Sequence, residues 1–528
     1  MRVSAYEIIL PLIEKDEREI PGQSLLVNGL YGAMDVVPEE IAAALARGEA
    51  ESLAPPIRER LLARGHITRK DEAAGTKASH PATAPALARP CASELAIVKL
   101  LGRIQRKIFS ASAITPVILP TYDCNFRCPY CYEGHRLKRG TEWLSQKMRP
   151  AMIQAVFAAL AKQRDKGRRI KDITLYGGEP LMAENREVVE AICAHAKDMG
   201  LEISIVTNGY DLDSYWDLLA KFPVSDMQLT VDGVGVLNDR RRRHRDGKPT
   251  YERILQNAGE AVKRGIDIQL RVNVDRENLS SIPALLQDLE ARGLRGKKEL
   301  TLYFAPVTFV HGSPAEIGYF DILAALREAG ESMEEAAGQV NILSTMAAKV
   351  WSIMEKKQPP EFSPAFCGAE TGMIVIAPDG KIFPCWDFVG IDREAVGYTD
   401  ETAGEFVLGL PTALWRTRTV DLMEPCQTCP YLFLCRGGCA AQAKRETGSC
   451  FKGHCGEIKK IADFVMSRLA GRKWEEESAR ESESGLIELT LSLAEPVARL
   501  TEGERKRIME TASQEEIFSI AKKTGFFA

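Results

Sequence analysis

The sequence predicts an α/β fold in which a parallel sheet curls into a partial (β/α)6 TIM-like barrel. Between residues 112 and 312, six short apolar runs alternate with amphipathic helical patterns. Strands joined by helical crossovers pair in parallel, and such sheets bind ligands at the carboxyl ends of their strands. The expected strands are Thr115–Pro120, Asp172–Tyr176, Glu202–Thr207, Asp226–Val231, Asp267–Val274 and Leu300–Ala305, and the expected helices include Arg149–Arg164, Val188–Met199, Tyr251–Arg264 and Ser281–Arg292.

The rest of the chain divides into shorter expected segments. Near the N-terminus, strand-like runs at Tyr6–Leu12 and Gln23–Leu30 precede helical patterns at Pro38–Arg47 and Pro56–Arg64. We therefore expect a small N-terminal α+β domain at 1–70, a linker rich in Ala, Thr and Pro with a lead-in helix at 71–111, the barrel at 112–312, a helical bridge at 313–366, a cysteine-rich domain at 367–455 and a charged helical tail at 456–528.

Composition narrows the class of protein. At 528 residues the chain is long enough for three or more domains, and 45% apolar with 27% charged residues is typical of soluble globular proteins. A net charge of −4 argues against a nucleic-acid-binding surface, and we expect no membrane span. The first residues carry no pattern of a cleaved signal peptide, so we expect a cytoplasmic location.

Thirteen cysteines are present, and eleven of them fall into two groups, at 124–131 and 367–455. Disulfide frameworks belong to short secreted chains, so this clustering favours metal ligation in a reducing compartment. Cys91 and Cys193 stand apart, and we expect both to be small buried residues.

The first group reads Cys124-Asn-Phe-Arg-Cys128-Pro-Tyr-Cys131 and follows the first barrel strand. Three thiolates from one loop can hold three irons of a [4Fe–4S] cubane and leave the fourth iron open. A structural zinc site usually closes with four ligands, and a purely structural loop is the other alternative. The spacing resembles the CxxxCxxC loop of radical S-adenosylmethionine (SAM) enzymes. The resemblance implies that the open iron binds SAM, that Tyr130 lies near the cofactor, and that a donor such as flavodoxin or ferredoxin supplies one electron to form a 5′-deoxyadenosyl radical.

Further motifs lie at the ends of the expected strands. Tyr176-Gly177-Gly178-Glu179-Pro180 follows the second strand, where glycines bring backbone groups close to a ligand. It resembles the GGEP motif of the same family, which implies contact of Gly177, Gly178 and Glu179 with the SAM amino group. The resemblance also implies contacts of Asn208, Thr230, Asp232 and Arg271 with the SAM carboxylate or ribose. Each residue has an alternative role as a turn former or helix cap, and Asp232 could orient substrate.

Asn238 opens a basic run that continues through Arg240–Arg243, His244 and Arg245. We expect this run to be a solvated face, as most charge runs are. The competing interpretation is a lid that meets a carboxylate-rich substrate, because the run resembles an HDxxR segment of related enzymes with Asn238 in place of the histidine.

The second cysteine group comprises Cys367, Cys385, Cys426, Cys429, Cys435, Cys439, Cys450 and Cys455. Its spacing resembles that of the SPASM domain, an extension of radical SAM enzymes that act on peptides and proteins. A zinc ribbon with two zincs is the alternative. The resemblance implies two auxiliary [4Fe–4S] clusters, one held by Cys367, Cys385 and Cys439 and the other by Cys426, Cys429, Cys435 and Cys455. Many relatives place a further ligand shortly before the equivalent of Cys367, and here the first cluster has either an open iron or Cys450 as a ligand. In sulfatase-maturating relatives an aspartate directly follows the equivalent of Cys385 and acts as a base; here Trp386 intervenes, which leaves Asp387 a candidate catalytic residue.

These motifs together predict an enzyme that cleaves SAM and abstracts hydrogen from a ribosomally made peptide, with a Cys-to-carbon thioether as the expected product. The N-terminal unit resembles the leader-recognition domains of peptide maturases, which bind a leader by adding a strand to a sheet edge. A plain N-terminal cap is the alternative. Three other functions stay open: a formylglycine-forming sulfatase maturase, a SPASM enzyme acting on a small molecule, and a non-catalytic iron–sulfur or zinc scaffold that binds peptides.

Overall fold

The computed structural model describes residues 1–69, 90–109, 113–131, 133–134, 142–310, 313–314, 317–357, 365–477, 486–510 and 513–524. They fall into two compact units, each described by itself. The barrel unit comprises Ser112–Ser344 and Gly372–Trp415, and the cysteine-rich unit comprises Met1–Ala111, Thr345–Thr371 and Arg416–Ala528. The expected linker lies almost entirely outside the described residues.

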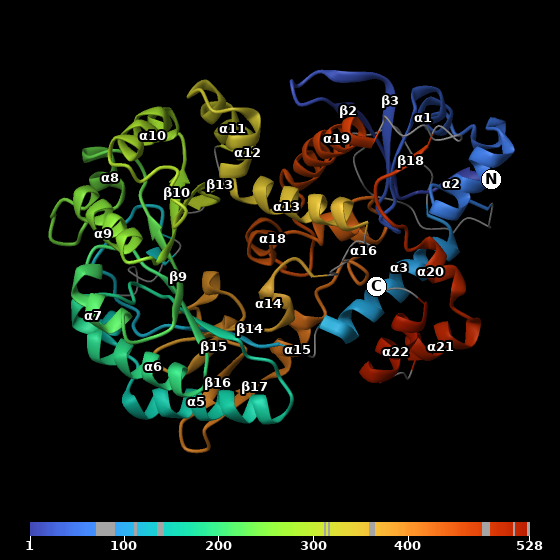
Figure 1. Ribbon diagram of the computed structural model, residues 1–528. Helices are drawn as coiled ribbons and strands as arrows, with labels where there is room; N and C mark the ends of the chain where they lie inside the picture. Colours follow the sequence, from blue (N-terminus) through green and yellow to red (C-terminus); the bar gives the residue numbers. More distant parts are fainter. Residues whose placement is uncertain are drawn as a thin grey trace. The chain divides into compact units, whose positions relative to one another are not determined.

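The barrel unit is built on one mixed sheet, and the predicted α/β class is confirmed. Six parallel strands follow each other in chain order: β6 (Thr115–Ile118), β7 (Asp172–Leu175), β8 (Glu202–Val206), β9 (Val224–Thr230), β10 (Asp267–Val274) and β11 (Leu300–Pro306). The crossovers run through α5 (Pro150–Asp165), α6 (Arg186–Asp198), α7 (Trp216–Leu219), α8 (Val236–Arg241), α9 (Tyr251–Lys263) and α10 (Ile282–Ala291) (Figure 1). Buried strand residues such as Ile173, Ile205 and Leu229 supply the apolar contact that holds these helices to the sheet.

The sheet continues past β6 into the region that the sequence assigned to the cysteine-rich domain. Strand β14 (Met373–Ile376) pairs in parallel with β6, and β15 (Lys381–Phe383), β16 (Gly397–Asp400) and β17 (Glu405–Leu408) extend it as antiparallel neighbours. The remaining elements of this unit are β12 (Phe309–Val310), β13 (Ser313–Pro314), α11 (Tyr319–Glu328), α12 (Met333–Gln339) and α15 (Leu410–Arg416). Cys385 therefore lies at the end of a strand of the barrel sheet.

The cysteine-rich unit begins with a small sheet of order β18-β4-β3-β2. Its strands are β2 (Glu7–Ile13), β3 (Glu19–Asn28), β4 (Met34–Pro38) and β18 (Ile487–Glu488), the last from the C-terminal tail; β1 (Arg2–Val3) and β5 (Ile67–Thr68) form a separate pair. The helices are α1 (Glu39–Ala46), α2 (Pro55–Arg64), α3 (Ala92–Phe109), α13 (Asn341–Lys356, which starts in the barrel unit), α14 (Gly368–Thr371), α16 (Glu424–Gln427), α17 (Leu432–Cys435), α18 (Ala440–Thr447), α19 (Ile458–Glu477), α20 (Ala494–Arg499), α21 (Glu502–Glu510) and α22 (Gln514–Thr524). The tail is thus part of the N-terminal sheet.

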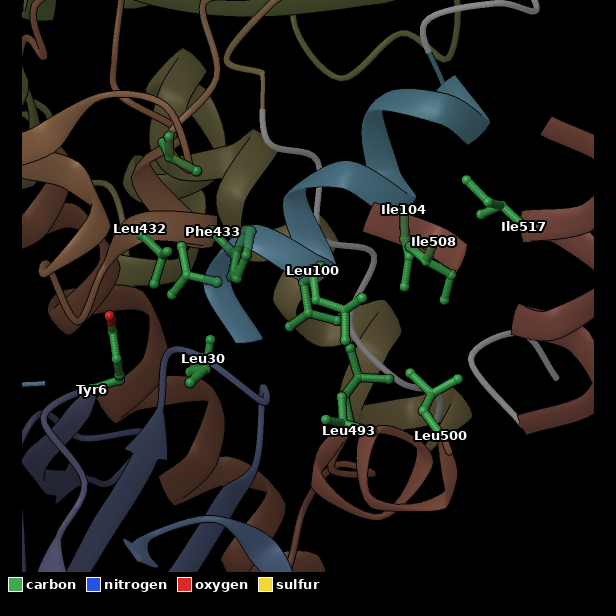
Figure 2. Close-up of a cluster of buried hydrophobic side chains, with 14 of the residues drawn as sticks. Tyr6, Leu30, Leu100, Ile104, Leu432, Phe433, Leu493, Leu500, Ile508 and Ile517 are labelled. Atoms are coloured by element: carbon green, nitrogen blue, oxygen red, sulfur yellow. The ribbon is translucent and has the colours of Figure 1, made fainter. Parts of the chain in front are cut away.

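One apolar cluster joins segments of this unit that are far apart in sequence (Figure 2). Tyr6 and Leu30, which flank strands β2 and β3, Leu100 from α3, Phe433 from α17 and Leu493 from the tail all contribute to it. Further members from α3 and the tail are Ile104, Leu500, Ile508 and Ile517. Because these side chains share one core, the tail and the N-terminal sheet are expected to unfold together.

No helix in the described ranges combines the length and the apolar composition that crossing a bilayer requires.

A buried charge network crosses the N-terminal sheet. His66 Nδ1 lies 2.8 Å from Glu7 Oε1, and His66 Nε2 lies 2.5 Å from Asp35 Oδ2. Arg64 donates to both carboxylate oxygens of Asp35, at 2.9 and 2.6 Å. Burial alone would lower the pKa of His66, but the charges and hydrogen bonds of Glu7 and Asp35 outweigh it and raise the pKa to about 9. His66 is therefore an imidazolium at neutral pH, and it links β2 to β4.

This network makes stability depend on pH. The folded-state pKa of His66 lies above its ordinary value of 6.5, so the stabilisation is fully present below pH 6.5 and is lost as the pH rises through about 9. We expect the free energy of unfolding, measured with urea, to fall by on the order of 3 kcal/mol across that window. A His66→Gln variant serves as the reference, and equal pH profiles for the two proteins would contradict the assignment.

Candidate functional site

The residues predicted from the barrel motifs gather at the carboxyl ends of the parallel strands. The three-cysteine loop follows β6, the Gly-Gly-Glu segment follows β7, and Asn208 follows β8. Thr230 ends β9 and lies in register with Arg271 on β10. Parallel strands bring their carboxyl ends to one edge, so five separate chain segments converge on a single site.

The Gly-Gly-Glu segment lies directly against the cysteine loop. A Cβ atom added to Gly178 would lie 2.0 Å from the carbonyl oxygen of Asp123, and Gly177 has φ of +126°. The amide of Glu179 donates to the same Asp123 oxygen at 2.8 Å. Only glycine permits this approach, so Gly177 and Gly178 position the loop that carries Cys124.

The Glu179 carboxylate is buried and satisfied from within the barrel unit. It accepts hydrogen bonds from Thr207 Oγ1 at 2.5 Å, from the Asn208 amide at 2.6 Å and from the Leu181 amide at 2.8 Å. Burial raises the pKa of Glu179 to about 7, an increase that these donors partly oppose. Glu179 therefore ties the end of β7 to the end of β8, in addition to the cofactor contact expected for it.

Asn208 is also committed to the cysteine loop. Its Nδ2 donates to Asn125 Oδ1 at 2.6 Å, and its Oδ1 accepts from the Tyr210 amide at 2.9 Å. Asn125 in turn donates to Asp211 at 3.1 Å. The sequence analysis did not single out Asn125, although it stands inside the cysteine motif.

Asp232 is a fully buried carboxylate that joins three segments. Tyr130, between the second and third cysteines, donates its hydroxyl hydrogen to Asp232 Oδ2, and the Asn273 amide donates to Oδ1 at 2.9 Å. The Arg242 guanidinium donates to the Tyr130 hydroxyl at 3.0 Å and lies 3.9 Å from Asp232. Arg242 thus neutralises the buried charge of Asp232, which a carboxylate in this position requires. Tyr130 and Asp232 are paired with each other in this structure.

The prediction that the basic run is a solvated face was wrong for three of its residues: Arg241 is 1% exposed, Arg242 8% and His244 5%. Arg240, Arg243 and Arg245 are exposed, as predicted. The amide of Arg127 donates to the Arg243 carbonyl at 2.7 Å, so the run also pairs with the cysteine loop through its backbone. The acidic partners, Asp232 for Arg242 and Asp275 for Arg241, and this backbone pairing come from other segments, and therefore the charge run alone did not predict them.

Arg271 and Asn273 point to the same face of β10, as their spacing predicts. Arg271 Nε donates to Asn273 Oδ1 at 2.7 Å, and the guanidinium lies over the Tyr303 ring at 5.9 Å from its centroid. Together with Thr230 they form the polar wall of the site on the β9 and β10 side.

Asp387 lies on a short 3-10 helix, Trp386–Phe388, directly after Cys385. The Trp386 ring is 39% exposed and lies 5.6 Å from the ring of Tyr176, the residue before Gly177. The end of β15 is thereby placed next to the Gly-Gly-Glu segment. The structure puts Asp387 in the neighbourhood of the barrel site, and its catalytic role stays a prediction.

In the cysteine-rich unit, four thiols form one group. The pKa of the Cys426 thiol is raised to about 12, mainly by burial and to a smaller extent by the charges of Cys429 and Cys455. Burial and the charges of Cys429, Cys455 and Cys426 likewise raise the pKa of Cys435 to about 12. A Cβ on Gly453 would lie 3.0 Å from Cys426 Sγ, so the Gly453-His454-Cys455 turn lies against this group. The resemblance assigned Cys455 to this group, and the charge of Cys455 acts on both Cys426 and Cys435.

Cys367 and Cys439 belong to the same unit, and the charge of Cys439 acts on Cys367. Burial of the thiol, then the charges of Glu370 and Cys439, raise the pKa of Cys367 to about 12, although other atoms of this residue are exposed. Cys385 belongs to the barrel unit. Its place beside Cys367 and Cys439 therefore stays a prediction.

Arg418 organises the loops that carry these thiols, and the sequence offered no signal for it. Its side chain is fully buried and forms an ion pair with Glu370, whose carboxylate accepts from the Cys367 amide at 3.2 Å. Arg418 also donates to the carbonyls of Gly437, at 3.1 Å, and Cys450. Its positive charge opposes the rise in the pKa of both Cys367 and Cys426.

The donor sets fit iron–sulfur clusters. Cys124 and Cys128 are half-buried thiols whose pKa is raised by burial, so they stay protonated until a metal displaces the proton. The charges of Cys128 and Cys131 both act on Cys124, which places the three thiols around a common space. In the described residues, no three His, Cys, Asp or Glu side chains converge on one metal-ion position. In a cubane, by comparison, each thiolate binds a separate iron.

The chain is similar to several known proteins. Residues 118–289 match the family described as the Radical SAM superfamily. The chain is 23% identical to the serine-type anaerobic sulfatase-maturating enzyme of Klebsiella aerogenes over 60% of this chain and 77% of that protein. It is 24% identical to the PqqA peptide cyclase of Granulibacter bethesdensis, over 62% and 82% of the two chains. The solved structure of native anSMEcpe with bound AdoMet and Cp18Cys peptide has a similar fold, with a TM-score of 0.51 and 15% identity over 70% of this chain and all of the other.

Gly178→Ala tests the contact that holds the cysteine loop. The added methyl group must displace the backbone at Asp123, so we expect a loss of about 1–3 kcal/mol in the free energy of unfolding and a lower iron content after reconstitution. Gly338→Ala is the matched control, because a Cβ at this helical position meets no atom within 4 Å. Equal behaviour of the two variants would contradict the role given to Gly178.

Arg418→Gln tests the buried ion pair. It leaves Glu370 without its partner, and we expect a loss of about 3–5 kcal/mol in urea unfolding, with the double variant Arg418→Gln/Glu370→Gln less destabilised than the sum of the single variants. Arg499→Gln removes an exposed ion pair with Glu495 and should change stability by less than about 0.5 kcal/mol. Additive single and double effects would show that Arg418 and Glu370 act independently.

Proposed function

Residues 118–289 match the Radical SAM superfamily, and we propose that the protein is a radical SAM peptide maturase. Proteins of this superfamily bind a [4Fe–4S] cluster and SAM, and the chain is an enzyme of this kind. The cofactor supplies a 5′-deoxyadenosyl radical when it is bound and reduced. We propose that this radical abstracts hydrogen from a ribosomally made peptide, and that flavodoxin or ferredoxin supplies the electron.

The observation that carries the proposal is the three-cysteine loop held at the carboxyl edge of the sheet. Cys124, Cys128 and Cys131 would hold the cluster, and the half-buried Gly177 and Gly178 would offer backbone groups to the SAM amino group. Arg271 and Thr230 would meet the carboxylate or ribose. Asp232, Tyr130 and Arg242 form a closed polar network beside the loop, which limits the access of water to a reactive radical.

The second group of cysteines favours a peptide or protein as substrate, because the SPASM domain that it resembles occurs in radical SAM enzymes that act on peptides and proteins. Cys426, Cys429, Cys435 and Cys455 would hold one auxiliary cluster. Cys367, Cys439 and Cys385 would hold another, with either Cys450 or an open iron at the fourth position. An open iron could bind a substrate thiol, which would favour a product with a Cys-to-carbon thioether. The relatives named above, a sulfatase-maturating enzyme and a peptide cyclase, support a protein or peptide as substrate.

A sulfatase-type maturase is the second candidate. The similarity to the sulfatase-maturating enzyme of Klebsiella aerogenes favours it, and so does Asp387 near the barrel site. This function needs no leader segment, and its product is a formylglycine. The small-molecule enzyme and the non-catalytic scaffold stay as further alternatives, and the scaffold would release no deoxyadenosine from SAM.

Replacement of Cys124, Cys128 and Cys131 by alanine tests the chemistry. After anaerobic reconstitution with iron and sulfide, we expect deoxyadenosine release from SAM with dithionite to fall to the level of a protein-free control, because no protein ligand then holds the cluster. Cys193→Ala is the control, since Cys193 is buried in α6 outside both thiol groups. Undiminished release in the triple variant would exclude the proposed function. Fragmentation mass spectrometry of a treated peptide then separates a cross-link from formylglycine.

A further inference from the structure

The N-terminal sheet has two edges, and one of them is better suited than the other to pairing with an added strand. At one edge, β2 contains Pro11, which has no amide hydrogen, and its register shifts between Pro11 and Ile13. Helix α19 also approaches this strand, since a Cβ on Gly471 would lie 2.2 Å from the Ile13 carbonyl oxygen. On the opposite side, the regular strand β4 is covered by the two-residue strand β18 of the tail. The β4 edge therefore suits strand addition better than the β2 edge does.

The edge of β4 is occupied by the chain's own tail. Ile487 and Glu488 pair antiparallel with Val36 and Asp35, and the Leu489 amide donates to the Met34 carbonyl at 2.9 Å. This strand has two residues, whereas β4 has five. An extended peptide segment therefore already sits where an added strand would bind.

The side chains of this segment define what the edge recognises. Leu486 is buried in the apolar cluster formed with α1 and α2. Glu488 forms an ion pair with Arg60 and lies 3.4 Å from Arg64 Nη1, both on α2. The edge thus accepts an aliphatic residue followed two positions later by an acidic residue, on the side covered by α2.

The anchor of the tail lies just beyond the paired residues. Thr490 Oγ1 accepts from the Met34 amide at 2.9 Å and donates to the Gly32 carbonyl at 2.8 Å, and Arg64 donates to the Thr490 carbonyl at 2.7 Å. Leu493 is buried in the large apolar cluster (Figure 2). Residues 486–488 can consequently leave the edge while the tail stays in place from Thr490 onward. The partly exposed ion pair with Arg60 contributes little to holding them.

We propose that Leu486–Glu488 covers the β4 edge as a displaceable strand, which an extended peptide must replace in order to bind there. The partner is an extended peptide segment with an aliphatic residue two positions before a Glu or Asp. This inference rests on the proposed peptide substrate. The tail is tethered, so it competes with a free peptide for the β4 edge at an effective concentration in roughly the millimolar range. A peptide must therefore bind tightly enough to displace it.

A labelled peptide in trans tests the proposal on the full-length protein. The probe is Leu-Ile-Glu-Leu-Thr-Leu-Ser-Leu, the sequence of residues 486–493, with a polar N-terminal extension and a fluorophore. Ile487→Pro removes an amide from the tail's own strand, and we expect it to bind the probe about tenfold or more tightly than the wild type by fluorescence anisotropy. Leu491→Ser is the control, because Leu491 is 45% exposed and lies outside the paired residues.

A charge exchange tests the recognition of the acidic residue. A probe with Lys in place of its Glu should bind the Ile487→Pro variant at least about tenfold more weakly, and Arg60→Glu in the same background should restore its binding. Equal affinity of both probes for Ile487→Pro, or no binding to a variant that still unfolds cooperatively, would overturn the proposal.

Hydrogen exchange on the wild type keeps the test independent of these variants. Added probe should speed exchange at Leu486–Glu488 and slow it in β4, and the absence of both changes would also overturn the proposal. Binding is measured without SAM or reductant. A protein that releases deoxyadenosine and does not bind the probe contradicts only the edge assignment, and one that binds the probe and releases none contradicts only the proposed chemistry.

Discussion

The contact between Gly178 and Asp123 is the constraint on which the barrel site depends. A backbone approach this close leaves no room for a Cβ atom, and it fixes the path of the chain as it enters the three-cysteine loop. The same loop is held from other sides by Asn208 through Asn125, by Asp232 through Tyr130 and by the backbone of Arg243. The thiols are thus carried by a loop whose position is set by four neighbouring segments, as a site that must hold a cluster in a defined place requires.

Several residues that are expected to contact the cofactor also form hydrogen bonds within the protein. The carboxylate of Glu179 accepts three hydrogen bonds from neighbouring residues, and the side-chain amide of Asn208 donates to Asn125. A side chain that is already locked by its neighbours presents its remaining atoms in one orientation, which reduces the entropy lost when a ligand binds. The two roles are therefore compatible, and substitutions at these residues are expected to affect the loop as well as the ligand.

In the cysteine-rich unit, other residues likewise hold the loops that carry the thiols. Arg418, paired with Glu370, connects the backbone near Cys367 with the carbonyls of Gly437 and Cys450. The apolar cluster of Figure 2 joins this unit's thiol-bearing loop, through Phe433, to the N-terminal sheet and the tail. The Tyr6 hydroxyl donates to the Gln427 carbonyl between two of the grouped cysteines. A peptide bound at the N-terminal sheet would therefore lie in the unit that carries these thiols.

The sequence by itself determined the six parallel strands, the α/β class and the two groups of cysteines, because periodicity and ligand spacing are local properties of the chain. It also determined that Arg271 and Asn273 share a face. It did not determine the strand β4, since Asp35 interrupts the apolar run and its partners Arg64 and His66 lie about thirty residues away. Nor did it determine the burial of Arg241 and Arg242, the pair Arg418–Glu370 or the strand that the tail adds to the N-terminal sheet. Each of these depends on a partner far along the chain that neutralises a charge or pairs with a backbone, and only the tertiary structure brings such partners together.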